Sequence, residues 1–386
     1  MLPIAITLLL ALALLKLGTE LYRLIADDSF VGAIDLRLRQ AEVKRWFAGL
    51  PVYTELTRFT YPPQAYVMLC PFTGWLGADA ARWLWALTSM AALAWLCSIA
   101  VRESGAADSL DRTLAVAMVL SMNAVGVTLG NGQLIVHLLP ALVVALLVLR
   151  RPDAGWLADV TAAMLLLFAL VKPTLSAPFA WAAVMTTRRV RPLALTVVGY
   201  VLMTLLAASF QREDAVTLVR QWAGQGGAEL GRGYGDVHSI LVAAGLEHWA
   251  MPLSLLMFAG LGIWTWKRRH ADPWILMGVA AIVARLWTYH RLYDDVLILL
   301  PMVALFRVAG SRPATGTEDV KAGVLLAIAI AVMAVPARLL GGGASALFIG
   351  GHVAVWLAML FFLARTSLPV APPPGMRRYT TAAPAD

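Results

Sequence analysis

Charge is scarce in this sequence. Asp, Glu, Lys and Arg make up 14% of its 386 residues, whereas soluble globular proteins carry about 25%. Cysteine is scarce as well: there are two, Cys97 lies inside an apolar run, and no C-x-x-C or H-E-x-x-H spacing occurs. A disulfide framework and a metal site therefore have no support in the sequence. The ten-residue segments of alternating polarity that a transmembrane β-barrel needs are also missing.

What the sequence has in abundance is apolar length. Hydrophobic residues make up 60% of the chain, and apolar runs of nearly membrane-spanning length recur from end to end. The predicted fold class is an all-α polytopic membrane protein with about twelve transmembrane helices. The first run lacks the basic start and the cleavage site of a signal peptide, so we expect it to remain as a helix. The runs lie near residues 2–23, 82–101, 112–129, 133–149, 156–171, 174–187, 192–210, 251–266, 273–288, 293–308, 321–339 and 346–364.

Basic residues cluster in alternate connections between these runs. By the positive-inside rule those connections are cytoplasmic, as are both termini. The net charge of +8 is thus loop charge and does not indicate a nucleic-acid partner. The basic clusters are Arg102 with Arg112, Arg150 with Arg151, Arg188 to Arg191, Lys267 to Arg269, and Arg307 to Lys321. The opposite, outer side receives loop 24–81, the GNGQ turn at 130–133, the turn at Lys172, loop 211–250 and the YHRLYDD segment at 289–295.

The chain is expected to form a single transmembrane domain, 1–365, followed by a Pro- and Ala-rich disordered cytoplasmic tail, 366–386. Within the first outer loop, residues 35–48 have the pattern of an amphipathic helix. Leu36, Val43 and Phe47 fall on one stripe, so this helix is predicted to lie flat at the membrane interface. The apolar stretch QAYVMLCPFTGW that follows is too short to span a bilayer.

The outer segments carry an ordered set of motifs. An acidic residue, Asp35, follows the first helix. After it come GLPVY at 49–53, YPP at 61–63, GNGQ at 130–133, the Lys172-Pro173 pair, and WTYHRLYDD at 287–295. This order resembles the polyprenol-phosphate-mannose-dependent glycosyltransferases of the GT-C class, glycosyltransferase family 87. The sequence departs from many relatives at Arg39, where they have Tyr.

The resemblance implies a GT-C-like bundle in a bacterial inner membrane. It implies transfer of a monosaccharide, mannose as the first guess, from a polyprenyl-phosphate donor to a glycolipid or glycan acceptor at the outer face. Asp35 matches the family's catalytic Asp. The departure at Arg39 leaves the identity of the sugar open. No cofactor is expected, and a requirement for a divalent metal is open, because the D-x-D pattern of some sugar transferases is absent.

Sugar transfer needs a carboxylate that takes a proton from the acceptor, cations that hold the donor phosphate, and polar or aromatic groups around the sugar. The base would be Asp35, with the ionised form favoured by the helix N-terminus and by Arg37 and Arg39. His290 is the second catalytic candidate. Candidates for the donor phosphate are Arg37, Lys172, Arg285 and Arg291, and candidates for the sugar or acceptor are Trp46, Tyr53, Tyr61, Asn131, Gln133 and Tyr289.

Each of these assignments has a structural alternative. Asp35 is also a suitable N-cap, and Asp27 and Asp28 are rival bases. Asn131 starts an ordinary Asn-Gly turn, and Lys172 at a helix end can extend to the lipid headgroups.

Two further alternatives concern the last outer segment and the whole protein. His290 and Arg291 can anchor the chain at the interface, with Asp294 and Asp295 serving only as partners of Arg291. For the whole protein, the alternatives are a multi-pass transporter or lipid flippase, or a GT-C-like protein without activity. A transporter would show inverted repeats and broken helices with charges near mid-membrane.

Overall fold

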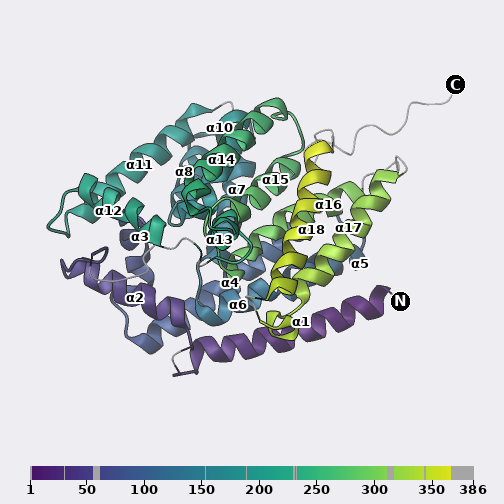
Figure 1. The fold of residues 1–386 in the computed structure, drawn as a ribbon, viewed down its shortest axis with the longest axis horizontal. Helices are drawn as coiled ribbons and strands as arrows, with labels where there is room; N and C mark the ends of the chain where they lie inside the picture. The colour runs from purple at the N-terminus through teal and green to yellow at the C-terminus, as the bar shows by residue number, and fades with distance from the viewer. Residues whose placement is uncertain are drawn as a thin grey trace.

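The computed structural model describes residues 2–29, 31–54, 61–152, 154–187, 189–228, 231, 233–310, 317–342 and 345–366. All regular secondary structure in these ranges is helical (Figure 1). The first helices are α1 (Leu2–Ile25), α2 (Ile34–Phe47), α3 (Pro63–Thr73), α4 (Ala78–Glu103), α5 (Ser109–Ser121), α6 (Asn123–Asn131), α7 (Ile135–Leu149), α8 (Trp156–Ala169), α9 (Pro173–Ser176) and α10 (Ala180–Thr186). They are followed by α11 (Val190–Ala208), α12 (Ala215–Ala228), α13 (Val237–Ala243), α14 (Ala250–Lys267), α15 (Pro273–Leu286), α16 (Leu299–Ala309), α17 (Thr317–Ala334) and α18 (Ala346–Arg365). Short 3-10 helices are η1 (Ala177–Phe179), η2 (Glu247–Trp249), η3 (Leu292–Ile298) and η4 (Ala337–Leu340).

The structure is that of a helical membrane protein, with fewer full-length spans than the twelve predicted. Five helical segments of the described chain are long and apolar enough to cross a membrane, and up to seven if two bent helix pairs each count as one span. Helix α7 has 15 residues, a length of ~22 Å at 1.5 Å per residue, which falls short of a hydrocarbon core of ~30 Å. Most predicted runs therefore are helices, but several are too short to be independent spans.

Two pairs of helices are joined by sharp bends. The sequence predicted one straight span at 112–129 for the first pair and two separate spans at 156–171 and 174–187 for the second. Helices α5 and α6 meet at a bend of 50°, and α8 and the segment 173–186 meet at a bend of 116°. Pro173 begins the second half of the latter pair, and proline cannot donate the backbone hydrogen bond that would continue α8. Lys172 lies at this break, between α8 and α9, and its side chain is buried in the protein interior.

A helix occupies the predicted position in the first loop, but it is not a simple amphipathic surface helix. The buried face of α2 includes Arg39, Gln40 and Glu42 beside Leu36 and Val43. A helix lying flat in an interface would bury apolar side chains alone. Helix α2 instead packs on α3 and α6 as part of the protein interior. Helix α3, at 11 residues, is short, as predicted for this stretch.

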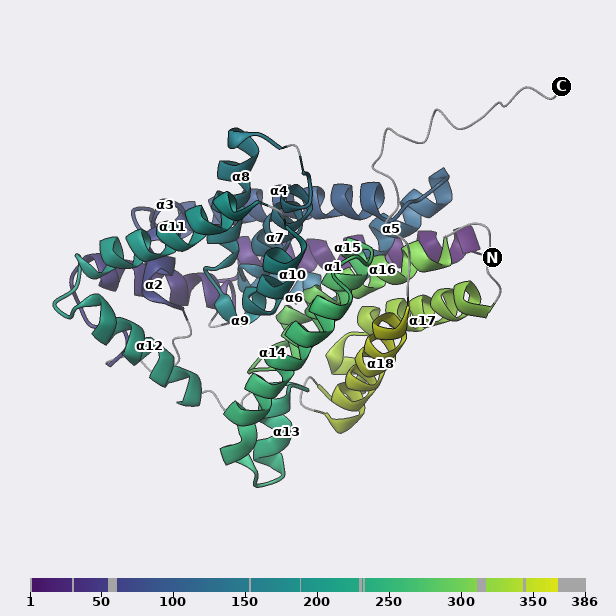
Figure 2. The same cartoon turned by 90° about the horizontal axis from the view of Figure 1, so that it is seen from above.

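The connections predicted to be cytoplasmic meet at one end of the bundle. The Arg307 Nη2 atom lies 2.7 Å from Asp272 Oδ2, and Arg307 Nη1 donates to the Glu103 carbonyl at 2.5 Å. Arg150 donates to the Ala271 carbonyl at 3.4 Å. Helix α4 leads from this end, at α5, to the opposite end, where α2 and α3 lie (Figure 2). The connections that contain Glu103, Arg150, Asp272 and Arg307 therefore lie together, and which side of the membrane they face stays a prediction.

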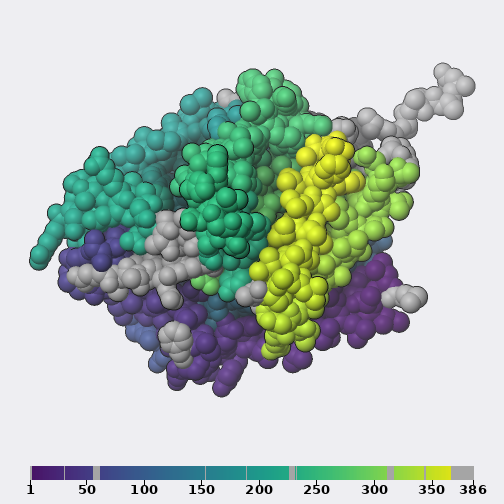
Figure 3. Space-filling model, in the orientation of Figure 1, coloured from purple at the N-terminus to yellow at the C-terminus, as the bar shows by residue number. Residues whose placement is uncertain are grey.

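The C-terminal helices complete the bundle. Helix α18 packs against α15, α16 and α17, and it runs in yellow across the face shown in Figure 3, with α17 beside it. The predicted disordered tail, 366–386, lies outside the described residues except for Thr366.

Candidate functional site

The GNGQ turn between α6 and α7 packs directly against the start of α2. The Ala33 N–H donates to the Gly130 carbonyl at 3.2 Å. Gly132 has a φ of +72°, and a Cβ on it would lie 2.6 Å from the Leu36 Cβ. Two features therefore require glycine at position 132: the left-handed backbone and the close approach of α2. Ala33 itself has a φ of +48°, a strained conformation for a residue with a side chain.

This contact places Asp35 against the turn. The polar side chains of Gln133 and Asn131 both act to lower the pKa of the Asp35 carboxyl. It does not cap α2: the N-cap position is Ala33, which makes no side-chain cap hydrogen bond. The N-cap alternative for Asp35 is therefore wrong.

Burial sets the protonation behaviour of Asp35. Burial raises the pKa of the Asp35 carboxyl, and the hydrogen bond from Gln133 and the positive charges of Arg39 and Lys172 oppose this rise without cancelling it. A raised pKa makes a carboxylate a stronger base. Arg37, expected to favour the ionised form, instead donates to the Ser29 carbonyl at 2.9 Å.

Lys172, at the α8 break, is buried and ion-paired. Its side chain is 9% exposed, and its Nζ lies 2.8 Å from Asp294 Oδ1. The ammonium also lies 5.1 Å from the centre of the Tyr293 ring. A lysine that extends to the headgroups would expose its charge, so that alternative is wrong. Lys172 brings a positive charge close enough to act on Asp35.

Asp294 binds three neighbouring groups in this part of the site. Its Oδ2 atom accepts from His290 Nδ1 at 3.0 Å and from the Arg291 backbone N–H at 3.1 Å. Its other oxygen binds Lys172. The sequence suggested Arg291 as its side-chain partner, but the Arg291 guanidinium donates to Tyr289 Oη at 2.5 Å instead. In the sequence, the four-residue spacing between His290 and Asp294 could have indicated their contact.

His290 is fully buried beside Asp294. Burial lowers the pKa of His290, and the hydrogen bond to Asp294 opposes that change. A neutral ring that donates a hydrogen bond from its Nδ1–H group to Asp294 matches this geometry. The structure thus brings His290 into the Lys172–Asp294 cluster rather than into contact with Asp35.

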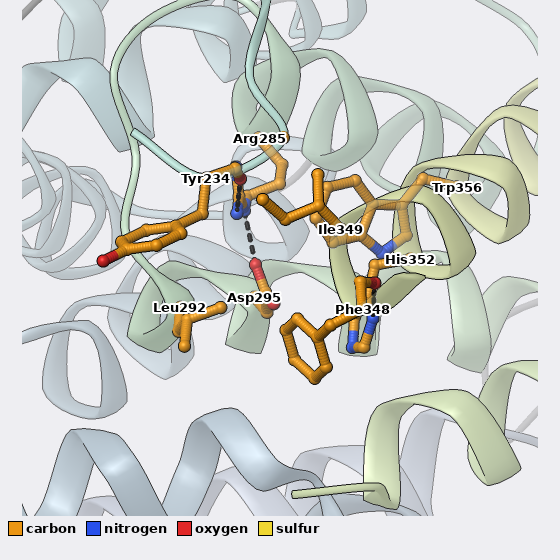
Figure 4. A pocket seen from close by; sticks show the side chains of 9 residues that line it. Tyr234, Arg285, Leu292, Asp295, Phe348, Ile349, His352 and Trp356 are labelled. Carbon is orange, nitrogen blue, oxygen red and sulfur yellow. Dashed lines mark hydrogen bonds and ion pairs between the residues drawn. The ribbon is translucent and has the colours of Figure 1, made fainter. Parts of the chain in front are cut away.

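Arg285 belongs to an adjacent cluster. Its Nε donates to Asp295 Oδ1 at 2.5 Å, and its Nη2 donates to the Tyr234 carbonyl at 2.6 Å. Its guanidinium lies 4.6 Å from the Trp356 ring centre. Figure 4 shows this arrangement, with Asp295 directed toward Arg285 and His352 close by on α18. Arg285, predicted to hold the donor phosphate, is therefore bound to Asp295 and to loop 211–250.

The predicted sugar-binding aromatic residues lie mostly in the core. Trp46 is 0% exposed, stacks on Tyr66 with 4.5 Å between ring centres, and donates to the Ala207 carbonyl at 2.9 Å. Tyr53 donates to the Tyr61 carbonyl at 2.8 Å. The structure places Trp46 and Tyr53 in the packing between α2, α3 and α11 rather than on a sugar-binding surface. Tyr61 differs, because its ring faces a cation near Asp35.

That cation is Arg39, which the sequence suggested as a charge that favours ionised Asp35 but not as a binding residue. Its guanidinium lies 4.6 Å from the Tyr61 ring centre, and its Nη1 lies 2.6 Å from Glu42 Oε2. Burial raises the pKa of Glu42 to about 8, against the opposing charge of Arg39. Asp35, Arg39 and Glu42 share one face of α2, which the spacing of four and three residues signals.

The rival bases lie elsewhere. Asp28 pairs with Arg82 at 2.8 Å and its side chain is 91% exposed. Asp27 Oδ1 accepts from the Ser29 backbone N–H at 2.9 Å, and its hydrogen bonds to Ser29 lower its pKa. The pKa of Asp27 responds to Ser29, whereas that of Asp35 responds to Asn131, Gln133 and Lys172.

Among the described residues, no group of three or more His, Cys, Asp or Glu side chains is placed to hold a metal ion. The structure defines a multi-pass helical membrane protein in which connections far apart in the sequence meet near the half-buried Asp35 and the buried pair of Lys172 and Asp294.

Residues 59–294, more than half of the chain, match the model of Glycosyltransferase family 87, and the chain belongs to this family of membrane glycosyltransferases. No curated protein and no solved structure matches the chain. The matched range contains Tyr61, Asn131, Gln133, Lys172 and His290 and begins after Asp35.

Proposed function

We propose that this protein transfers a monosaccharide from a polyprenyl-phosphate donor to a hydroxyl group of a glycolipid or glycan, at the outer face of a bacterial inner membrane. Mannose is the first candidate for the sugar. The observation that carries the proposal is the meeting of the outer connections: the Ala33 N–H donates to the Gly130 carbonyl, the Thr128 hydroxyl donates to the Tyr293 carbonyl, and Lys172 pairs with Asp294. The connections that meet in this way are all predicted to lie on the outer side.

In the proposed reaction Asp35 is the general base. The acceptor oxygen forms a bond to the anomeric carbon, and its proton passes to the Asp35 carboxylate. The bond between that carbon and the phosphate oxygen breaks, and polyprenyl phosphate leaves with the electron pair. A half-buried carboxylate with a raised pKa suits this role, because it binds the proton more strongly than an exposed one.

The donor phosphate needs positive charge, and Lys172 is the one of the four predicted phosphate-binding residues whose charge acts on Asp35. Its ammonium carries three N–H groups, of which one binds Asp294. Asp294 and His290 are then positioning residues that hold Lys172 at the bend of α8. Arg39 is a second cation that acts on Asp35, and Arg291 remains a further candidate.

The alternative of a transporter or flippase draws on the two broken helices, because discontinuous helices also mark transporter sites. Membership of a glycosyltransferase family favours the enzyme. The break at Lys172 is consistent with both an enzyme and a transporter, so the assay must distinguish sugar transfer from movement of the lipid.

The test is a transfer assay with purified protein in detergent and radiolabelled donors. We expect a polyprenyl-phosphate monosaccharide to be consumed and its sugar to appear on a lipid or glycan acceptor. Nucleotide sugars serve as the matched control and should not be used. Transfer from a nucleotide sugar would contradict the proposal. So would movement of the intact donor between leaflets of proteoliposomes with no sugar transferred to any acceptor.

A further inference from the structure

Arg291 packs against two tyrosine rings in the last outer segment. Its guanidinium carbon lies 5.5 Å from the centre of the Tyr234 ring and 5.5 Å from the centre of the Tyr289 ring. Its Nε atom donates to Tyr289 Oη at 2.5 Å. All three side chains are half-buried. Two aromatic rings and a hydrogen bond therefore hold the guanidinium in place while it stays partly accessible.

Tyr234 comes from loop 211–250, and its backbone is bound to the helix and the segment that carry the site. Its N–H donates to the His290 carbonyl at 3.0 Å, and its carbonyl accepts from Arg285 Nη2 at 2.6 Å. In Figure 4 the Tyr234 ring points away from Arg285. The backbone contacts thus fix the position of Tyr234, and its ring is the part that contacts Arg291.

Arg291 differs from the neighbouring cations in having no acidic partner. Three other cations of the site are each paired with a carboxylate: Arg39 with Glu42, Lys172 with Asp294, and Arg285 with Asp295. Within the ranges that the structure describes, no carboxylate lies at salt-bridge distance from Arg291. Its positive charge is therefore not neutralised by this part of the chain.

A phosphate group bound in the site needs positive charge that the protein has not already neutralised. The pair of Lys172 and Asp294 is neutral as a whole, so it offers hydrogen bonds but no net charge. A guanidinium can bind phosphate through two parallel N–H groups while its flat, weakly hydrated face stacks on aromatic rings. The bond from Arg291 to Tyr289 uses Nε and neither Nη group. Arg291 thus combines the charge and the support that phosphate recognition requires.

We propose that Tyr234 is a positioning residue: together with Tyr289 it holds the Arg291 guanidinium so that this group binds the phosphate of the donor and of the polyprenyl phosphate that leaves. This inference rests on the proposed function, because it takes the donor to be a polyprenyl-phosphate sugar. It gives loop 211–250 a part in the site, which no sequence motif indicated. Tyr234 acts through Arg291 and does not itself touch the phosphate.

The test is a titration of purified protein in detergent with polyprenyl phosphate, and with unphosphorylated polyprenol as the reference ligand. Arg291→Met should weaken binding of polyprenyl phosphate by about 10- to 150-fold and leave polyprenol binding unchanged. Tyr234→Leu should weaken it by about 2- to 5-fold, whereas Tyr234→Phe, which keeps the ring, should bind as the wild type does. In the Arg291→Met background, Tyr234→Leu should have no further effect, because Tyr234 acts through Arg291. These dissociation constants do not depend on how much of the protein is folded.

Arg269→Met is the matched control. The Arg269 guanidinium also lies over an aromatic ring, 4.5 Å from the Trp266 ring centre, but in a connection predicted to be cytoplasmic, so its loss should not change the affinity. Unchanged affinity for polyprenyl phosphate in Arg291→Met, or a loss from Tyr234→Leu that persists without Arg291, would overturn the inference and leave the proposed donor class standing. Equal affinity of the wild type for polyprenol and polyprenyl phosphate would instead contradict the proposed donor, and the inference would fail with it.

Discussion

Substitution of Lys172 by Met is expected to destabilise the fold as well as weaken donor binding. The reason is the ion pair at the α8 break, where the Lys172 side chain is 9% exposed and the Asp294 side chain 1% exposed, with 2.8 Å between Nζ and Oδ1. Removing the lysine leaves a buried carboxylate with hydrogen bonds from His290 and the Arg291 backbone only. Breaking a buried pair in this way costs about 3–5 kcal/mol.

Neutralising both partners should restore most of that loss. In Lys172→Met/Asp294→Asn no unpaired charge is buried, and the new amide can still bind His290. We expect the double variant to recover at least about 2 kcal/mol relative to Lys172→Met, since removal of both charges avoids most of the penalty. Donor affinity should not recover with it. Loss of a charge-assisted hydrogen bond to phosphate is worth about 1.5–3 kcal/mol, or about 10- to 150-fold in Kd.

The assay combines unfolding by denaturant in detergent micelles with binding of a radiolabelled polyprenyl-phosphate sugar. Two results would refute this reasoning. If Lys172→Met is as stable as the wild type, the pair does not hold a buried charge. If the double variant is stable and binds donor with unchanged affinity, Lys172 does not contact the phosphate.

Three further predictions concern sidedness, pH and the turn. In a chain without its native cysteines, cysteine at Ser29 should react with a membrane-impermeant thiol reagent in intact spheroplasts, and cysteine at Ser109 should react only after permeabilisation; the reverse pattern would place the site on the inner face. Because burial raises the pKa of Asp35, transfer should be lost as pH falls through a value above the ordinary ~3.9, and an acidic limb at or below that value would contradict the assignment. Gly132→Ala puts a Cβ 2.6 Å from that of Leu36, so transfer should fall by about 100-fold through displacement of α2. Transfer at the wild-type rate in this variant, measured beside its thermal unfolding, would show that the turn does not position the base.

The meeting of the outer motifs could be predicted from the sequence because it depends on topology. Asp35, Asn131, Gln133 and Lys172 each follow or precede an apolar run on the side that lacks the Arg clusters, and the positive-inside rule puts such connections together. The structure brings these connections together, since Ala33 bonds to Gly130 and Thr128 bonds to Tyr293. The helical fold class and the positions of most apolar helices could also be predicted from hydropathy alone.

The choice of partners inside the site could not be predicted in the same way. The sequence places Asp294 three residues from Arg291, yet its carboxylate binds Lys172, which is distant in the chain. Arg39 and Glu42 have the spacing of a solvated helix face, but tertiary packing buries both. The number of full-length spans was overestimated because an apolar run predicts burial, and burial inside a helical bundle does not require crossing the bilayer.

The most direct test of the central claim is the transfer rate of Asp35→Asn beside that of Asp28→Asn. Asparagine keeps the size of the side chain and its hydrogen-bonding oxygen, but it cannot take a proton from the acceptor hydroxyl. We predict that Asp35→Asn folds, binds the polyprenyl-phosphate donor and loses transfer by about 10²–10⁴-fold, whereas Asp28→Asn, exposed and paired with Arg82, transfers at the wild-type rate. Near wild-type transfer by Asp35→Asn would contradict the account.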